Sequence, residues 1–441
     1  MSVNAMPVEF TERLVYLLGD LGAMRPQLGA VVTFDGMLDE ARLRRALRLL
    51  LDAEPVLGCS FGADAVPPTW RRLDSIDEAT LLRSTESSDP ASDAAAFVAE
   101  SFDPRDGPQL LGLLLHSEGH DTLAIKMAHA AVDGGALKET LYLLAQIYGE
   151  LDAEPAWRPE PNLDGVRGPF AKAGFLEIVR ALRESRIVAP PTDWGASDFV
   201  GDGQATYLSA VVEPKTFRPA AAMARCAGAT VNDLILAAYY RVLYRLFDPA
   251  PGDRTPLQVS CELRKHLPKG TKTALSNISS AWSISLSRVE GETFEETLGR
   301  VVESTLAWKR SGAGRAGAIG MPLINSLTRR QGLDSLRRQM MRGFSGAVSG
   351  KGYPTLTNIG IIDEARLGFG ARPAVTDAWL LGPIGSTVVL TASTFRNRLH
   401  LTIGAEVDAI ERRSMEAIAQ ETAEEIAGWV DESETASRRS S

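Results

Sequence analysis

The sequence predicts an α/β protein of two lobes. Its 441 residues are about three times a typical domain length, so two domains or two lobes around a shared cleft are expected. Helix-like and strand-like hydrophobic periods alternate along most of the chain. A stretch rich in Pro, Gly and Asp, from about Glu150 to Gln204, separates two halves with a similar order of elements. We therefore expect an N-terminal lobe at 1–175, a linker at 176–204, a C-terminal lobe at 205–430 and a disordered tail at 431–441, where apolar residues are lacking.

Periodicity and turn signals define the elements of the first half. The segment LDEARLRRALRLLLDAEP carries leucines at 43, 47, 50 and 51 with acidic residues in its first turn, which predicts a helix that ends before Pro55. The apolar runs QLLGLLLH and TLAIKMAH are joined by SEGHD, which predicts a hairpin. The expected elements are helices at 8–20, 38–55, 136–149 and 170–186, and strands at 28–36, 55–61, 109–116 and 122–129.

The second half shows the same mixture of elements. Expected here are strands at 205–213, 256–262 and 278–287, three strand-like runs within 355–405, and helices at 215–227, 230–247, 293–310, 328–342 and 411–429.

Composition excludes several functional classes. The net charge of −9 and the pI near 5.3 argue against binding to nucleic acid or to an anionic membrane surface, which requires a basic field. No apolar run reaches membrane-spanning length, so no integral membrane segment is expected. The three cysteines are far apart and form no disulfide or zinc pattern. The first residues carry Glu9 and Glu12 before a short amphipathic stretch, unlike a secretory leader, so none is expected. We therefore expect a cytoplasmic protein without a metal site.

The segment KMAHAAVDGG (126–135) carries the strongest chemical signal. His129 is expected at the end of a strand and the following residues in a loop before a helix, a place where side chains can reach a ligand. A histidine there can accept a proton near neutral pH. Asp133 can pair with an arginine and hold the loop, while Gly134 and Gly135 allow conformations or approaches that a Cβ forbids. The alternative is a structural histidine before an ordinary turn, because His-x-x-x-Asp-Gly also arises by chance.

The wider sequence resembles the chloramphenicol-acetyltransferase-like superfamily, which includes condensation domains of peptide synthetases, plant BAHD acyltransferases, wax ester synthases and polyketide-associated acyltransferases. Its members carry H-x-x-x-D-G between a strand and a helix, about a third of the way along the chain. Four further segments are similar to family elements: LDEARLRRALRLLLDAEPVLGCSF, GATVNDLILAAYYRVL, LQVSCELRKHLP and YPTLTNIG.

The resemblance implies two lobes, each a mixed sheet flanked by helices, that form a V-shaped cleft with His129 where two channels meet. It implies an acyltransferase that moves an acyl group from a thioester to a hydroxyl or amine, with His129 as general base and no acyl-enzyme. Asp133 would point toward Arg264. Acyl-CoA or a phosphopantetheine thioester would be the co-substrate, with no permanently bound cofactor. The partners would be a small-molecule acceptor and an acyl or peptidyl carrier protein, in secondary or lipid metabolism.

Two departures from the family patterns keep alternatives open. Condensation domains usually have two adjacent histidines, whereas Ala128 precedes His129 here, which favours stand-alone acyl transfer over peptide synthesis. The D-F-G-W-G signature of BAHD enzymes is absent, with only LGFGARP (367–373) as a loose echo. An amide-forming condensation enzyme of a nonribosomal peptide pathway and a non-catalytic carrier-binding or scaffold protein remain the alternatives.

Other polar residues are weaker candidates. The amides of Asn358, in TLTNIG, and Asn277, in ALSNISS, could contact substrate or an oxyanion, or could simply cap turns. The basic tract TRRQGLDSLRRQMMRG could meet coenzyme A phosphates or an acidic carrier protein, or could be a solvated helical face. Its candidate docking residues are Arg329, Arg330, Arg337 and Arg338.

Overall fold

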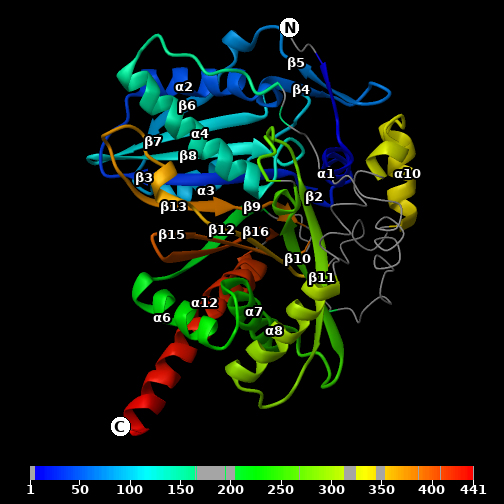
Figure 1. The fold of residues 1–441 in the computed structure, drawn as a ribbon, viewed down its shortest axis with the longest axis vertical. Coiled ribbons are helices and arrows are strands. Elements are labelled where there is room, and N and C mark those ends of the chain that lie inside the picture. The colour runs from blue at the N-terminus through cyan, green and yellow to red at the C-terminus, as the bar shows by residue number, and fades with distance from the viewer. Residues whose placement is uncertain are drawn as a thin grey trace.

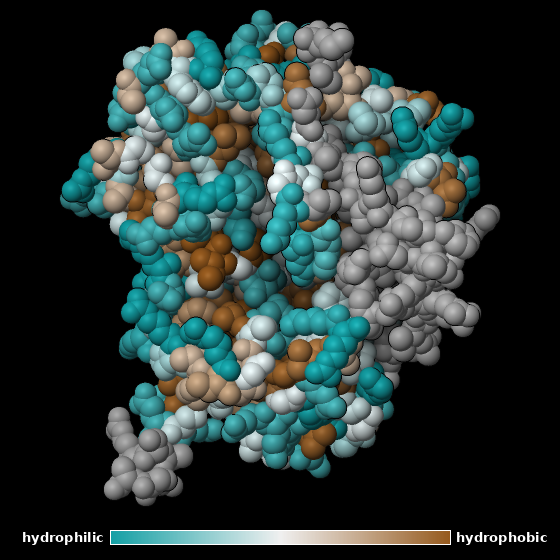
Figure 2. Space-filling model, in the orientation of Figure 1, coloured by the Kyte–Doolittle hydropathy of each residue, from teal (hydrophilic) through white to brown (hydrophobic). Residues whose placement is uncertain are grey.

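A computed structural model of the chain describes residues 5–163, 165, 194, 204–267, 269–311, 324–343, 353–385, 387–407 and 409–440. The chain folds into two lobes that lie one above the other in Figure 1, with the early part of the chain in the upper lobe. Hydrophilic residues dominate the face seen in Figure 2, and smaller hydrophobic areas lie between them.

The first part of the chain forms most of the upper lobe. Its elements are β1 (Ala5–Pro7), α1 (Phe10–Asp20), β2 (Met24–Arg25), β3 (Gln27–Phe34), α2 (Glu40–Ala53), η1 (Pro55–Gly58), β4 (Cys59–Gly62), β5 (Thr69–Arg72), η2 (Ile76–Glu78), β6 (Leu82–Glu86), α3 (Pro90–Ala99), β7 (Leu110–Ser117), β8 (His120–Ala128) and α4 (Gly134–Ala153).

The later part forms the lower lobe and returns once to the upper one. Its elements are β9 (Gln204–Val212), α6 (Pro214–Cys226), α7 (Val231–Phe247), β10 (Arg254–Glu262), η4 (Arg264–His266), β11 (Ser279–Ser287), α8 (Phe294–Ser311), α10 (Leu333–Gly343), β12 (Thr355–Ile361), η5 (Glu364–Arg366), β13 (Val375–Leu381), β14 (Ile384–Gly385), β15 (Val389–Phe395), β16 (Arg398–Val407) and α12 (Ala409–Ser440).

The upper lobe is built on a five-stranded sheet in the order β13-β3-β8-β7-β6. Successive side chains of β3 alternate between its faces. Leu28, Ala30 and Val32 join the core that contains α2 and α4, whereas Val31 joins a separate cluster with α3. Helices therefore cover both faces, and the end of β8 is held between packed layers.

The lower lobe is built on a six-stranded sheet in the order β11-β10-β12-β15-β16-β9. Strand β12 runs parallel to both β10 and β15, and the remaining pairs are antiparallel. Alternate residues such as Leu257, Val259, Leu390 and Leu401 form one core with helices α6, α7, α8 and α12. The sheet thus has a helix-covered face, and the site described below lies near the ends of β10 and β12.

The two lobes are not continuous in sequence, which corrects the predicted division at 205–430. Strand β13 pairs antiparallel with β3 and forms the edge of the upper sheet, and β14 pairs with β2. Helix α10 packs Leu333, Leu336 and Met340 into the upper core and lies beside α1 in Figure 1. Pairing with β13 covers the otherwise open hydrogen-bonding edge of β3.

The end of the chain also differs from the prediction. Helix α12 continues to Ser440, so the tail expected at 431–441 is helical over almost its whole length. Extending a helix that is already nucleated needs only one residue fixed per hydrogen bond, and Glu, Ala and Arg are good helix formers. The helix expected at 170–186 and nearly all of the linker expected at 176–204 lie outside the described residues.

Candidate active site

His129 follows directly after β8, at the place where the strand turns toward α4. Its backbone N–H donates to the Pro26 carbonyl at 2.8 Å, which extends the β3–β8 pairing beyond Gln27 and Ala128. The side chains of Ala128, Ala130, Ala131 and Val132 are fully buried in the upper core. These apolar residues hold the loop, so the direction of the His129 ring is determined by packing.

The imidazole of His129 is held in one tautomer. Its Nδ1 lies 2.8 Å from the Val132 carbonyl oxygen, which can only accept, so Nδ1 carries the proton of the neutral ring. Burial lowers the pKa of His129 below its ordinary value, and the bond to the Val132 carbonyl opposes this only in part. The ring is therefore neutral near pH 7 and its Nε2 retains a lone pair, as a general base requires.

Asn277 supports the His129 backbone. Its Nδ2 donates to the His129 carbonyl at 3.0 Å, and its Oδ1 accepts from the hydroxyl of Ser279 at 2.7 Å. Only 1% of Asn277 is exposed. The structure thus places Asn277 behind the histidine as a buried support, which differs from the oxyanion or substrate contact suggested by the sequence.

Asp133 joins the two lobes beside His129. It caps α4 by accepting the backbone N–H of Ala136 at 2.8 Å. It also accepts the backbone N–H of Ile278 at 2.6 Å, from the lower lobe. Its two oxygens lie 2.8 and 2.9 Å from Arg264 Nη1, so the ion pair implied by the family resemblance is present.

Arg264 donates hydrogen bonds to several groups beside Asp133. Its Nη1 also donates to the carboxylate of Glu262 at 2.9 and 3.0 Å, and Nη2 donates to the Ser276 carbonyl at 2.7 Å. Burial lowers the pKa of Arg264, but Asp133 and Glu262 outweigh this and raise it overall. Burial and the nearby charge of Asp133 together raise the pKa of Glu262. One guanidinium therefore pairs with two carboxylates.

The glycines allow the lobes to approach at the start of α4. A Cβ on Gly135 would lie 2.9 Å from Arg264 Nη1 and closer still to Glu262 Oε2, and a Cβ on Gly134 would lie 3.0 Å from Ile359. Real Cβ contacts are rarely this short, so both positions require close backbone approach rather than unusual dihedrals.

A cavity of about 180 Å³ lies between the lobes at this loop. It is lined by Leu28, His129, Asp133, Gly134, Gly135, Lys138, Ser260, Cys261, Glu262, Ser279, Thr357, Asn358, Ile359 and Pro383. Two larger cavities adjoin the same region. One of about 390 Å³ includes Pro26 and Gln27 in its wall, and one of about 680 Å³ includes Ala136 and Arg264.

Asn358 lies in the cavity wall at a bulge in β12. The register with β15 shifts between Asn358 and Gly360, and Asn358 Oδ1 accepts the Gly360 N–H at 3.0 Å. Gly360 has a φ of +82°, a conformation that favours glycine. The side-chain oxygen of Asn358 thus stabilises the bulge, and the residue borders the same cavity as His129.

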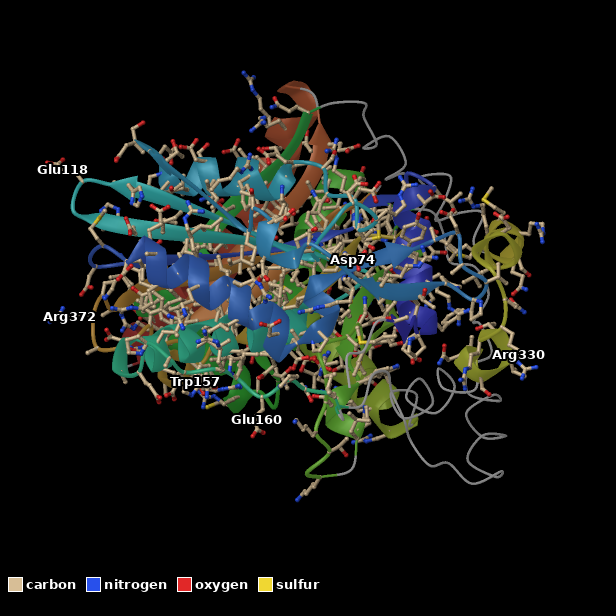
Figure 3. All side chains as sticks on the ribbon, turned by 90° about the horizontal axis from the view of Figure 1, so that it is seen from above. Asp74, Glu118, Trp157, Glu160, Arg330 and Arg372 are labelled. Carbon is tan, nitrogen blue, oxygen red and sulfur yellow. The ribbon has the colours of Figure 1, made fainter. Side chains whose placement is uncertain are left out.

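The basic tract lies away from this cavity. Arg329, Arg330 and Arg338 are exposed, and Figure 3 shows Arg330 at the outer edge beside α10. Arg337 forms an ion pair with Asp20 of α1. None of these four arginines lines the cavity, so their role in docking remains a prediction.

Sequence reasoning missed two charged residues of the cavity, Lys138 and Glu262. Both had a readable signal. Lys138 follows Gly134 by four residues, so it shares that face of α4, and Glu262 precedes Arg264 by two residues at the end of β10.

In the described part of the chain, no group of three or more His, Cys, Asp or Glu side chains is arranged to hold a metal ion. No helix in those ranges combines the length and apolar character needed to cross a membrane.

Comparisons with known proteins show which proteins share this fold. No protein-family profile matches the chain. Surfactin synthase subunit 1 of Bacillus subtilis is 27% identical over 255 residues, which are 54% of this chain and 7% of that much longer protein. The chain thus spans a small part of this relative.

Solved structures match almost the whole chain. Polyketide synthase associated protein 5 from Mycobacterium tuberculosis has a TM-score of 0.66 at 15% identity, with 95% of this chain and 96% of the other covered. The first condensation domain of the CDA synthetase has 0.65 at 17%, covering 97% and 98%. Trichothecene 15-O-acetyltransferase from Fusarium sporotrichioides has 0.68 at 12%, covering 96% and 95%. The predicted two-lobed fold class and the superfamily resemblance are confirmed at the level of the fold.

Proposed function

We propose that this chain, which has the two-lobed chloramphenicol-acetyltransferase-like fold of condensation domains and acyltransferases, transfers an acyl group from a thioester to a hydroxyl or amine. The observation that carries the proposal is the state of His129. Its Nδ1 is bonded to the Val132 carbonyl, burial lowers its pKa, and it borders a cavity between the lobes. A neutral imidazole with a free Nε2 lone pair is suited to general base catalysis.

The reaction proceeds by direct transfer. Nε2 of His129 takes the proton of the acceptor as its oxygen or nitrogen forms a bond to the thioester carbonyl carbon. The carbonyl π electrons move to oxygen, and a tetrahedral intermediate forms. When this collapses, the C–S bond breaks, and the thiolate receives the proton from the imidazolium. No acyl-enzyme is formed, since the acceptor itself is the nucleophile.

The adjoining cavities support two separate substrates. The cavity of about 390 Å³ has Pro26 in its wall, whose carbonyl accepts the His129 backbone N–H, and the cavity of about 680 Å³ has Ala136 in its wall, whose N–H is bonded to Asp133. Acyl-CoA or a phosphopantetheine thioester on a carrier protein would be the donor, with no resident cofactor. The likeness to a peptide synthetase domain and to a polyketide synthase associated protein supports a carrier-protein partner. The exposed arginines 329, 330 and 338 are candidates for that docking.

Ala128 bears on the choice between these alternatives. Its methyl group is fully buried in the upper core, at the position where condensation domains usually have a second histidine. An amide-forming condensation enzyme of a peptide pathway would use the same His129 chemistry with an amine acceptor. A non-catalytic carrier-binding protein would keep the fold and bind without turnover.

The test is release of free thiol. Purified protein is incubated with a panel of acyl-CoA and acyl-pantetheine thioesters and with pooled alcohols and amines, and mass spectrometry identifies the ester or amide product. His129→Ala should lower the rate about 10²- to 10⁴-fold. His120→Ala is the matched control, because His120 begins the same strand at its opposite end. Wild-type-like turnover by His129→Ala contradicts the proposal. Binding without any thiol release by the wild type favours the non-catalytic alternative.

A further inference from the structure

Lys138 is a charged side chain of the cavity that the proposed chemistry does not yet use. It lies on α4 four residues after Gly134 and three after Gly135, so all three share one face of the helix, and all three line the cavity with His129. We propose that Lys138 is a further catalytic residue, whose ammonium group donates a hydrogen bond to the thioester carbonyl oxygen and stabilises the negative charge that forms there. This inference rests on the proposed acyl transfer.

The ammonium group is held in place by the other lobe. Nζ donates to the carbonyl oxygens of Ile359 at 2.7 Å and Ile361 at 3.3 Å, both in β12. An ammonium has three N–H donors, so these two bonds leave one. Among the described residues, no third acceptor bonds to Nζ. The remaining N–H is therefore available to a ligand in the cavity that Lys138 lines.

The charge of Lys138 is also available. Within the described ranges, no carboxylate forms an ion pair with it. The acid in the same cavity, Glu262, is bonded to Arg264 through Nη1 and through the Arg264 backbone N–H at 2.9 Å. Asp133 is bonded to Arg264 as well. Arg264 and Lys138 together balance the two carboxylates.

This balance of charges favours binding of the tetrahedral intermediate, in which the new negative charge on oxygen is matched by the proton on His129, over binding of an anionic substrate. In the resting site the two cations offset the two carboxylates, and His129 is neutral. When the acceptor attacks, the carbonyl oxygen gains a negative charge and His129 gains a proton, so the cavity as a whole remains neutral. A fixed ammonium beside the oxygen needs no reorganisation during this step, which is how preorganised donors lower a barrier.

A purely structural role is the competing explanation. The bonds from Lys138 hold β12 on both sides of Gly360, whose N–H is bonded to Asn358. Loss of Lys138 could therefore act by loosening the bulge. A structural tie depends on the length of the side chain and its donors, whereas charge stabilisation also depends on the protonation of Nζ.

The pH profile separates the two roles. Burial lowers the pKa of Lys138, while Glu262 and Glu139 raise it and Arg366 lowers it further. The other charged or titratable groups in the cavity wall are His129, Asp133 and Cys261, and Arg264 contacts both acids. Since the protonated amine is the active form, kcat should fall as pH rises through the lowered pKa. An arginine stays protonated to far higher pH.

Two variants test the proposal by thiol release. Lys138→Met should lower kcat about 10²- to 10³-fold and change KM by less than about threefold. Lys138→Arg should retain more activity than Lys138→Met and should shift the alkaline fall of kcat to higher pH. Thermal unfolding and circular dichroism check that both fold, and Lys215→Met on the exposed surface of α6 is the control.

Three results overturn the proposal. A Lys138→Met enzyme with kcat within threefold of the wild type removes the role altogether. Equal losses in both variants with an unchanged alkaline limb leave only the tie between α4 and β12. A wild-type chain that releases no thiol from any donor overturns the proposed function and this inference together, whereas the first two results leave acyl transfer intact.

Discussion

Replacing Asp133 by alanine removes the carboxylate that connects the upper and lower lobes beside His129. The carboxylate accepts from the backbone N–H groups of Ala136 and Ile278 and pairs with Arg264, and only 2% of the residue is exposed. The variant therefore leaves two backbone N–H groups without an acceptor, and it leaves Arg264 with one carboxylate partner fewer.

The expected cost follows from these contacts. Loss of the α4 cap costs about 1 kcal/mol. Removing one partner of a buried ion pair costs about 3–5 kcal/mol, and the lower end applies because Glu262 still contacts Arg264. The free energy of unfolding should fall by about 4 kcal/mol, a large part of the roughly 5–15 kcal/mol that stabilises a typical protein. Asp133→Asn keeps the shape and an acceptor for Ala136, so its loss should be about half as large.

Guanidinium unfolding and the rate of thiol release together measure the effect. The Asp133→Ala variant should lose stability and, since His129 is then held less firmly, should lose about 10- to 100-fold in kcat. Unchanged stability with a loss of kcat as large as that of His129→Ala would refute the reasoning, because Asp133 would then act in the chemistry. Exchange of the charges between Asp133 and Arg264 should not restore the site, because an arginine at 133 cannot accept the two backbone N–H groups.

Two further predictions concern the same loop. Gly135→Ala should lower kcat/KM at least about tenfold, because its Cβ would overlap the Glu262 carboxylate. Adding Glu262→Ala to the same chain should restore part of the loss. If the second change restores no activity, the steric cause is contradicted. The acid limb of kcat/KM should lie below the ordinary histidine pKa of 6.5, because burial lowers the pKa of His129 and only the neutral ring accepts a proton. The prediction fails if the acid limb has a pKa of 6.5 or above and keeps it in active variants whose acids near His129 are replaced. His129 would then not be a base that burial keeps neutral.

Elements with strong local signals were readable from the sequence. The hairpin of β7 and β8, the helix α2 and the helix α7 have observed bounds within a few residues of those expected, because each has a clear period and end signals. Short or polar elements were missed. Strand β6 has only one buried residue, Leu82, so its pattern resembles a loop, and α3 has a readable Asp89 cap and Pro90 but little periodic apolar sequence.

The residues that support the site were harder to predict. Asn358 and, on a weaker signal, Asn277 were both candidate substrate contacts in the sequence, yet Asn277 lies behind His129 and Asn358 lies in the cavity wall. Their amides have the same chemistry. Only the path of the chain between the lobes distinguishes a buried support from a residue that borders the cavity.

By itself, the sequence determined the strand, turn and helix that carry His129 and Asp133, since these depend on hydrogen bonds and apolar periods within a few residues. The tertiary structure decided the return of β13 to the upper sheet, the two carboxylates around Arg264 and the anchoring of Lys138 on β12. Lys138 and Ile359 are 221 residues apart in the chain. Contacts at such separations arise from the packing of whole lobes, which no local pattern encodes.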